Sequence, residues 1–290
     1  METINRQSFS ERLQSYKRRP FSLFLAIIAV LSAAITLAVL AALLLYILAK
    51  GIPHLCPELF EWEYNTTNVS MMPAVINTLT ITGMTLIIAV PAGVFSAIYL
   101  VEYAKRGSRF VSVVRITTET LSGIPSIVFG LFGYLVFNIY LGWGYSILGG
   151  ALTLAIMVLP LMIRTAETAL LAVPDAFREG SFGLGAGKLR TVFRVVLPSA
   201  VPGILAGVIL AVGRIVGETA ALLYPAGTAA EVADGVFSSG RTLAVHMYAL
   251  LNEGLYMEQA YATAVILLVL VVGINTLSSF IAKKAGVKES

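Results

Sequence analysis

Charged residues and cysteine are scarce in this sequence of 290 residues. Asp, Glu, Lys and Arg make up only 12% of it, which is about half the share that is typical of soluble globular proteins. The 20 basic and 16 acidic residues give a net charge of +4. Because no dense basic face stands apart from the apolar runs, a nucleic-acid partner is not expected. The single cysteine, Cys56, excludes an internal disulfide.

Long apolar runs take the place of charge, and 58% of the residues are hydrophobic. A spanning helix needs roughly 20 mainly apolar residues. Six stretches meet this condition, the third polar at its start and the fourth short: residues 21–49, 74–101, 116–141, 146–163, 199–225 and 259–282. The first run is longer than a signal-peptide core of about 7–15 residues, and no small-residue cleavage site follows it. The sequence therefore predicts an all-α integral membrane protein with six transmembrane helices and a retained first helix.

The charges in the connecting loops alternate along the chain. Basic residues gather before the first run, between the second and third, between the fourth and fifth, and after the last. The other loops are uncharged or acidic on balance, as with Glu58, Glu61 and Glu63. Under the positive-inside rule, both termini are predicted to be cytoplasmic. The expected organisation is a segment 1–20, a first helix 21–49, a core 74–282 of five transmembrane helices with a cytoplasmic loop 164–198, and a tail 283–290.

The cytoplasmic loop contains the glycine-rich stretch GLGAGK, which superficially resembles a phosphate-binding loop. A P-loop needs a glycine where Phe182 stands, and Ser or Thr where Leu189 stands, so a nucleotide site is not expected. The pattern instead predicts a short helix with Asp175 as its N-cap and a glycine stop at Gly183, Gly185 and Gly187. A second amphipathic piece, 188–197, is expected to end at Pro198. The segment either lies on the inner membrane surface or inserts into a cytoplasmic partner.

This loop resembles the E-A-A-x3-G-x9-I-x-L-P motif of ABC importer permeases. Glu179, Gly185 and Val195 occupy the glutamate, glycine and isoleucine positions, and Leu197 and Pro198 close the motif. Gly180 and Ser181 replace the two alanines. The resemblance implies that the loop is the coupling helix that docks on an ATPase subunit, with Asp175 and Arg178 in its first turns.

Two charged residues stand in the fifth run, Arg214 and Glu218. A charge near the bilayer centre costs roughly 2.5–3.5 kcal/mol, so such residues face protein or water. At a spacing of four residues, the two are expected on one helix face, either as a structural ion pair or as an anion-handling site. In the third run, Arg115 and Glu119 have the same spacing, and a structural role is expected there.

Ser122, Gly123 and Pro125 follow in the third run and are candidates for a helix break, either along the transport path or as a packing kink. Together, LSGIPSIVFGLFGY and GRIVGETAALLYP resemble the phosphate-specific ABC permeases, with the A-type subunit the most similar. The resemblance covers residues 73–282. It implies the type I importer fold and carries the intramembrane charges of the family onto Arg214 and Glu218.

The same resemblance implies the partners and the location. These are a second, PstC-like permease, two PstB-like ATP-binding subunits and an extracytoplasmic phosphate-binding protein, in the inner membrane of a bacterium or archaeon. ATP and Mg²⁺ are expected on the partner ATPase, and no cofactor on this chain. His54 and Cys56 are too few for a metal site, and His246 is expected to be a packing residue. No catalytic arrangement is evident, so no enzyme activity is expected. Sulfate or molybdate as cargo, an ion-gradient-driven transporter and a membrane scaffold remain the alternatives.

Overall fold

The computed structural model describes residues 20–105 and 107–284. The predicted terminal segments therefore fall largely outside the described residues, with their basic residues Arg12, Lys17, Arg18, Arg19 and Lys288. The chain divides into two units, residues 1–50 and 51–290. The first unit contains α2 (Pro20–Gly51), a single helix without a charged side chain before Lys50.

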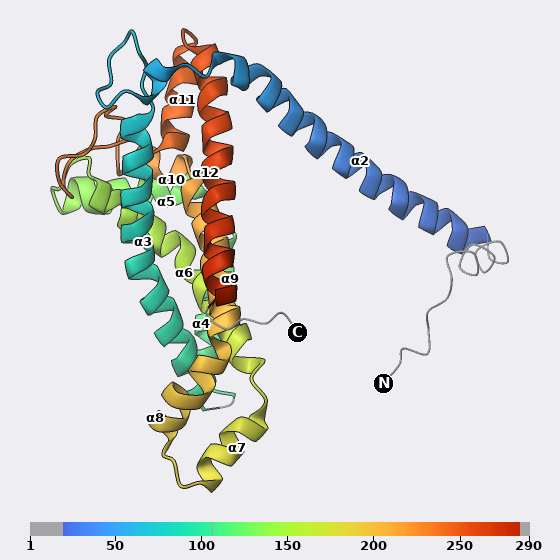
Figure 1. Ribbon diagram of the computed structural model, residues 1–290. Helices are drawn as coiled ribbons and strands as arrows, with labels where there is room; N and C mark the ends of the chain where they lie inside the picture. The colour runs from blue at the N-terminus through green and yellow to red at the C-terminus, as the bar shows by residue number, and fades with distance from the viewer. Residues whose placement is uncertain (1–19, 106, 285–290) are drawn as a thin grey trace. The chain divides into compact units, whose positions relative to one another are not determined.

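The second unit is a helical bundle, and its described residues contain no strand. Its elements, in which η marks 3₁₀ and π segments, are η1 (Ile52–His54), η2 (Pro57–Phe60), α3 (Met72–Ile98), η3 (Tyr99–Tyr103), α4 (Arg109–Ser122), α5 (Ser126–Gly133), η4 (Tyr134–Tyr140), α6 (Ile147–Leu171), α7 (Asp175–Gly183), α8 (Lys188–Thr191), η5 (Val192–Val196), α9 (Leu197–Val216), α10 (Ala220–Leu223), α11 (Leu243–Glu253) and α12 (Met257–Lys284). Helices α7 and α8 lie at one end of this unit and α11 lies at the other (Figure 1).

Five of the six predicted runs correspond to single spanning helices. Among the described residues, five helical stretches are long and apolar enough to cross a membrane: Phe21–His54, Met72–Tyr103, Ile147–Leu171, Lys188–Val216 and Met257–Phe280. The third predicted run folds as two helices, α4 and α5 with η4, bent by 102° at the break. The predicted all-helical membrane architecture is confirmed, with five candidate spans in the described chain and a sixth if this bent pair crosses as one span. The orientation of the termini remains a prediction.

Three prolines lie within helical stretches of the second unit. Pro91 and Pro160 lie inside continuous helices, α3 and α6. Pro198 was expected to end the amphipathic piece, but the helical stretch Lys188–Val216 runs through it. The π segment η5 comes just before Pro198. A π segment changes the hydrogen-bonding register, which allows the chain to accommodate a residue without an N–H.

Helix α6 lies at the centre of the second unit and has the most buried side chains, among them Leu154, Val158 and Met162. Its neighbours α3 and α9 approach it closely through glycines. A Cβ on Gly93 of α3 would lie 2.6 Å from the Met162 Cβ, and a Cβ on Gly207 of α9 would lie 2.2 Å from the Thr165 Oγ1. Small residues of this kind allow membrane helices to pack closely, where van der Waals contact replaces the hydrophobic effect.

Candidate functional site

The cytoplasmic loop forms the predicted short helix, α7, between Asp175 and Gly183. Its N-cap is Pro174, so the expectation that Asp175 is the cap is wrong by one residue. Pro174 has an extended ψ of 138° and makes no side-chain cap. Asp175 is the first helical residue, where its carboxylate interacts favourably with the positive end of the helix dipole.

The glycine stop after α7 is confirmed. Gly185 has a φ of +80°, a left-handed conformation that glycine adopts without a Cβ penalty. The Gly185 N–H donates to the Phe182 carbonyl at 2.9 Å, and the Ala186 N–H donates to the Ser181 carbonyl at 3.1 Å. These bonds satisfy carbonyls at the helix end and reverse the chain toward α8.

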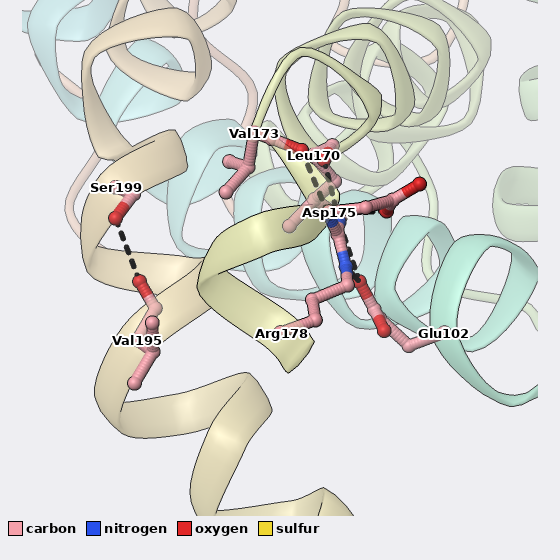
Figure 2. Close-up of polar contacts among 7 residues, drawn as sticks. All are labelled: Glu102, Leu170, Val173, Asp175, Arg178, Val195 and Ser199. Carbon is pink, nitrogen blue, oxygen red and sulfur yellow. Dashed lines mark hydrogen bonds and ion pairs between the residues drawn. The ribbon is translucent and has the colours of Figure 1, made fainter. Parts of the chain in front are cut away.

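Arg178 fixes α7 to the rest of the bundle (Figure 2). Its Nε and Nη2 both donate to Oε1 of Glu102 in η3, at 3.0 and 2.9 Å. The same side chain donates to the carbonyls of Leu170 and Val173, at 2.9 and 2.7 Å, and to Asp175 Oδ1 at 3.2 Å. The Arg178 and Glu102 side chains are only 14% and 9% exposed. One guanidinium thus joins α7, the C-terminal end of α6 and the end of α3.

A second contact links the same segments. The Lys188 Nζ of α8 lies 5.1 Å from the centroid of the Tyr103 ring in η3. The hydroxyls of Ser181 and Thr191 are 2.9 Å apart and hydrogen-bond α7 to α8. Ser181 therefore serves the internal structure of the loop.

Several other positions of α7 and of the turn after it have no partner in the described chain. Glu179 and Gly180 are exposed, and Glu179 makes no hydrogen bond or ion pair with the described residues. Large apolar side chains are exposed beside them: Phe177 is 51%, Phe182 47% and Leu184 91% exposed. A short helix that is anchored by an arginine and also exposes aromatic residues is suited to contact another protein.

Leu197 and Pro198, which close the motif, lie at the start of α9. Leu197 packs against the buried cluster that includes Val192 and Val196, and Pro198 is exposed. The Ser199 hydroxyl donates to the Val195 carbonyl at 2.8 Å, so it serves a carbonyl close to the irregular turn (Figure 2). The end of the motif is therefore packed into the bundle at Leu197 and exposed at Pro198.

The predicted break in the third run is confirmed at Ser122 and Gly123. The amides of Gly123 and Ile124 donate to Thr120 and Leu121 carbonyls within the turn, at 3.1 and 3.2 Å. Since both amides are already used, they are not free to line a transport path. The Ser122 hydroxyl donates to the Thr118 carbonyl at 2.9 Å.

Beside this break lies a cavity of about 190 Å³ between α4 and α6. Six of its seven lining residues are polar or charged, and the set is Arg115, Thr118, Glu119, Ser122, Pro160, Arg164 and Glu167. Arg115 forms an ion pair with Glu167 of α6. Arg115 was expected to pair with Glu119, four residues later. Its partner is instead Glu167, because Glu119 is exposed and makes no ion pair with the described residues.

Arg214 and Glu218 do not share a helix face, so that expectation is wrong. Helix α9 ends at Val216 with Gly217 as its C-cap, nine residues before the predicted end of the run at 225. Glu218 follows in an irregular turn, and its Oε1 accepts from the Ala221 N–H at 3.2 Å, at the start of α10. Within the described residues Arg214 has no hydrogen bond or ion pair, and it is exposed. The structural ion pair is absent, and the Arg214 guanidinium is left available.

The carboxylate partners of Arg178 and Arg115 were missed by sequence reasoning. Nothing local marks Glu102 or Glu167, which lie 76 and 52 residues from their arginines. Asn275 of α12, whose Oδ1 is buried without a partner, lies next to Gly213, one residue before Arg214. Its polar amide within an apolar run was the one available signal.

Cofactor and metal chemistry find little support in the described residues. His54 Nδ1 lies 3.3 Å from Glu258 Oε2, and no three His, Cys, Asp or Glu side chains of the described chain gather to hold an ion. His246 is fully buried. The candidate site thus consists of α7 at one end of the bundle and a set of polar groups on the predicted spans.

Comparison with known proteins gives a consistent family. A family model described as "Binding-protein-dependent transport system inner membrane component" matches residues 89–285. The probable ABC transporter permease protein YqgI of Bacillus subtilis is 36% identical over 245 residues, covering 78% of this chain and 81% of YqgI. The phosphate transport system permease protein PstA of Haemophilus influenzae is 34% identical over 223 residues, covering 75% and 77%.

Solved structures agree in fold. A bacterial alginate ABC transporter, crystallised with an alginate-bound periplasmic protein, has a chain with a TM-score of 0.70 at 14% identity, covering 93% of this chain and 97% of that one. An inward-facing MetNI methionine ABC transporter gives a TM-score of 0.58 at 19% identity, covering 83% and 97%. At these identities the likeness concerns the fold.

Proposed function

This chain belongs to the family of binding-protein-dependent transport system inner membrane components, the ABC importer permeases, and on that premise we propose that it imports inorganic phosphate. It is a multi-pass inner membrane protein, and members of its family work with an ATPase and a binding protein. PstA permeases of several organisms are 34–38% identical to it. These relatives favour phosphate over sulfate or molybdate as the cargo.

The observation that carries the transport proposal is that α7 is anchored to the bundle and still exposes apolar side chains. Arg178 anchors it to η3 and to the end of α6, while Phe177, Phe182 and Leu184 are exposed. We assign this exposed surface, with Glu179 and Gly180, to the ATPase contact. Nucleotide-driven movement of the ATPase then moves α7, and the Arg178 clamp passes that movement to α3 and α6.

The transport path is assigned to the intramembrane polar groups. Arg214 has a planar guanidinium free of any described carboxylate, which suits a phosphate oxyanion. Ser122 and Gly123 mark the broken span on the polar cavity between α4 and α6. Glu218 helps to shape the turn after α9 and does not neutralise Arg214.

The proposed assembly contains a second, PstC-like permease, two PstB-like ATPases and an extracytoplasmic phosphate-binding protein. ATP and Mg²⁺ bind to the ATPases, and this chain performs no hydrolysis and carries no cofactor. Both termini are cytoplasmic in this arrangement, in the inner membrane of a bacterium or archaeon.

Uptake of labelled phosphate at low external concentration tests the proposal. The cells lack this chain and also lack any second phosphate carrier. Wild type restores uptake, and excess phosphate competes while excess sulfate and molybdate do not. Arg214→Gln, at wild-type membrane abundance, reduces uptake at least about tenfold if one charge-assisted hydrogen bond is lost. Arg109→Gln, at an exposed arginine of α4, is the matched control and retains uptake. Competition by sulfate or molybdate would reassign the cargo, and unchanged uptake in the null strain would refute phosphate transport.

A further inference from the structure

A buried arginine without a partner lies at the end of the second unit opposite α7. Arg241 precedes α11, and its side chain belongs to a residue that is only 4% exposed. Its Nε and Nη2 are both buried and have no hydrogen-bond partner. No ion pair of the described residues includes Arg241, although an unpaired buried charge is costly.

The backbone holds Arg241 firmly in place. Its N–H donates to the Ala229 carbonyl at 3.0 Å, and its carbonyl accepts from Asn77 Nδ2 at 3.4 Å. Asn77, buried in α3, also donates to the Glu231 carbonyl at 2.9 Å and accepts from the Ala233 N–H at 3.1 Å. The Leu243 N–H donates to the Thr78 Oγ1 at 2.8 Å. The unpartnered guanidinium donors are therefore positioned by a built framework and are not the product of a loose loop.

Two rings complete the surroundings of this guanidinium. Its Cζ lies 4.7 Å from the centroid of the Tyr64 ring, and Tyr64 meets His246 edge to face at 6.2 Å. His246 is fully buried, and neither of its ring nitrogens has a partner. Burial, and then the charge of Arg241, lower the pKa of His246 to about 3. The imidazole is thus neutral and offers one further N–H donor.

The nature of the missing partner follows from the donors. Nε and Nη2 form the side edge of the guanidinium, the fork that binds two oxygens of one carboxylate or phosphate. Glu61, an acidic residue of the first connecting loop, is already bonded by the Asn68 amide at 2.6 Å. A single positive charge with two parallel donors and a nearby imidazole N–H matches a small anion with several oxygens.

We propose that Arg241, with His246 and beneath Tyr64, forms an oxyanion-binding site of the phosphate class at the end of the bundle opposite α7. The site rests on the proposed function for its choice of phosphate as ligand and is separate from Arg214. Because Arg241 is almost closed off, the anion reaches it only when its cover moves, and half-buried Tyr64 is part of that cover. The site holds the anion at the start of the path, before it reaches the intramembrane groups.

Direct binding of labelled inorganic phosphate to the assembled permease–ATPase complex, without binding protein, tests this site. An Arg214→Gln background removes the contribution of the path. The background complex binds phosphate, and Arg241→Gln weakens this binding at least about tenfold, as the loss of a bidentate charged contact implies. Arg241→Lys keeps the charge but loses the fork, and weakens binding similarly. His246→Gln has a smaller effect of the same sign, and Arg109→Gln has none.

The outcomes separate the site from the cargo. Elution of each complex at the wild-type position on size exclusion shows that it is assembled. If the Arg241→Gln complex does not assemble, Arg241→Lys is used as the test variant. Unchanged binding in the assembled Arg241 variants, or no oxyanion binding to the background complex, overturns the site while phosphate uptake by wild type leaves the proposed function intact. Arg241-dependent binding of sulfate or molybdate, but not phosphate, supports the oxyanion site and contradicts phosphate as the cargo. A third result would also overturn the proposal: no complex binds the anion, and Arg241 variants fail to dock the binding protein. The Nε and Nη2 donors of Arg241 would then be assigned to a carboxylate of that protein.

Discussion

Arg178 of α7 and Glu102 of η3 are joined by two hydrogen bonds of 3.0 and 2.9 Å, in a nearly buried pair separated by 76 residues of chain. The same guanidinium binds two carbonyls at the end of α6, where a cation is favoured by the helix dipole. This arrangement means that α7 cannot move without α3 and α6 unless the pair breaks.

Charge reversal at this pair tests the clamp. Arg178→Glu, or Glu102→Arg, leaves a buried charge unpaired at a cost of about 3–5 kcal/mol, and each is expected to reduce uptake at least tenfold. The double exchange restores part of the uptake, because the ion pair re-forms while the bonds to the α6 carbonyls do not. ATPase activity of the assembled complex is measured alongside. A clamp that transmits motion leaves ATP hydrolysis without matching transport, whereas equal loss of both activities and of protein abundance would indicate a purely structural pair.

Gly185 provides a test of the chain reversal after α7. With a φ of +80° and no atom within 4 Å of an added Cβ, the position has space but requires a left-handed backbone. Gly185→Val is expected to abolish uptake while membrane insertion persists, because the strain of roughly 1–2 kcal/mol falls on the coupling segment. Gly185→Asn is the matched control, since asparagine tolerates this conformation. Equal uptake by both variants would show that the conformation is not needed.

Gly207 tests the packing of α9 on α6. A Cβ there would lie 2.2 Å from the Thr165 Oγ1, so Gly207→Leu forces the helices apart at a cost of about 1–3 kcal/mol or more. We expect a lower melting temperature of the detergent-purified complex and reduced abundance. Gly83→Leu, where nothing lies within 4 Å of the added Cβ, is expected to melt like wild type. A wild-type melting temperature for Gly207→Leu would show that this close approach is not required.

The buried His246 predicts a pH dependence of stability. It lies in α11, outside the membrane spans, and its pKa falls from 6.5 to about 3, through burial and then the charge of Arg241. Between these values the unfolded chain binds one more proton than the folded one. The free energy of unfolding therefore decreases as pH falls from about 6.5 toward 3, by at most about 5 kcal/mol.

Melting temperatures in phosphate-free buffer, measured from pH 7 to pH 4.5, examine this effect. The comparison variant is His246→Gln, which has no proton to gain and should lose stability less steeply over this range. Phosphate is left out because an anion at Arg241 would offset part of the charge acting on His246. Identical slopes for the two proteins would contradict burial of a neutral imidazole.

The local features of this protein were determined by its sequence. Apolar runs of sufficient length predict the spans wherever they occur, and Gly185 is placed at the left-handed turn because few other residues adopt it. The break at Ser122 and Gly123, and the helix between Asp175 and Gly183, follow in the same way from a few neighbouring residues. A predicted helix boundary was wrong where a local rule was overridden. The amphipathic piece does not end at Pro198, because the π segment η5 accommodates this proline within a continuous helix.

Only the tertiary structure decided which charges meet. Arg115 and Arg214 each had a carboxylate four residues away, but Arg115 pairs with Glu167, and the helix end at Val216 separates Arg214 from Glu218. Arg178 turns inward to Glu102, and Arg241 is buried with its fork unpartnered. Helical periodicity describes neighbours within a turn or two, whereas these relations depend on how α3, α6, α7 and the loop before α11 pack. The residue type determines which side chains are charged, but the partner of each charge is determined by packing between segments that are distant along the chain.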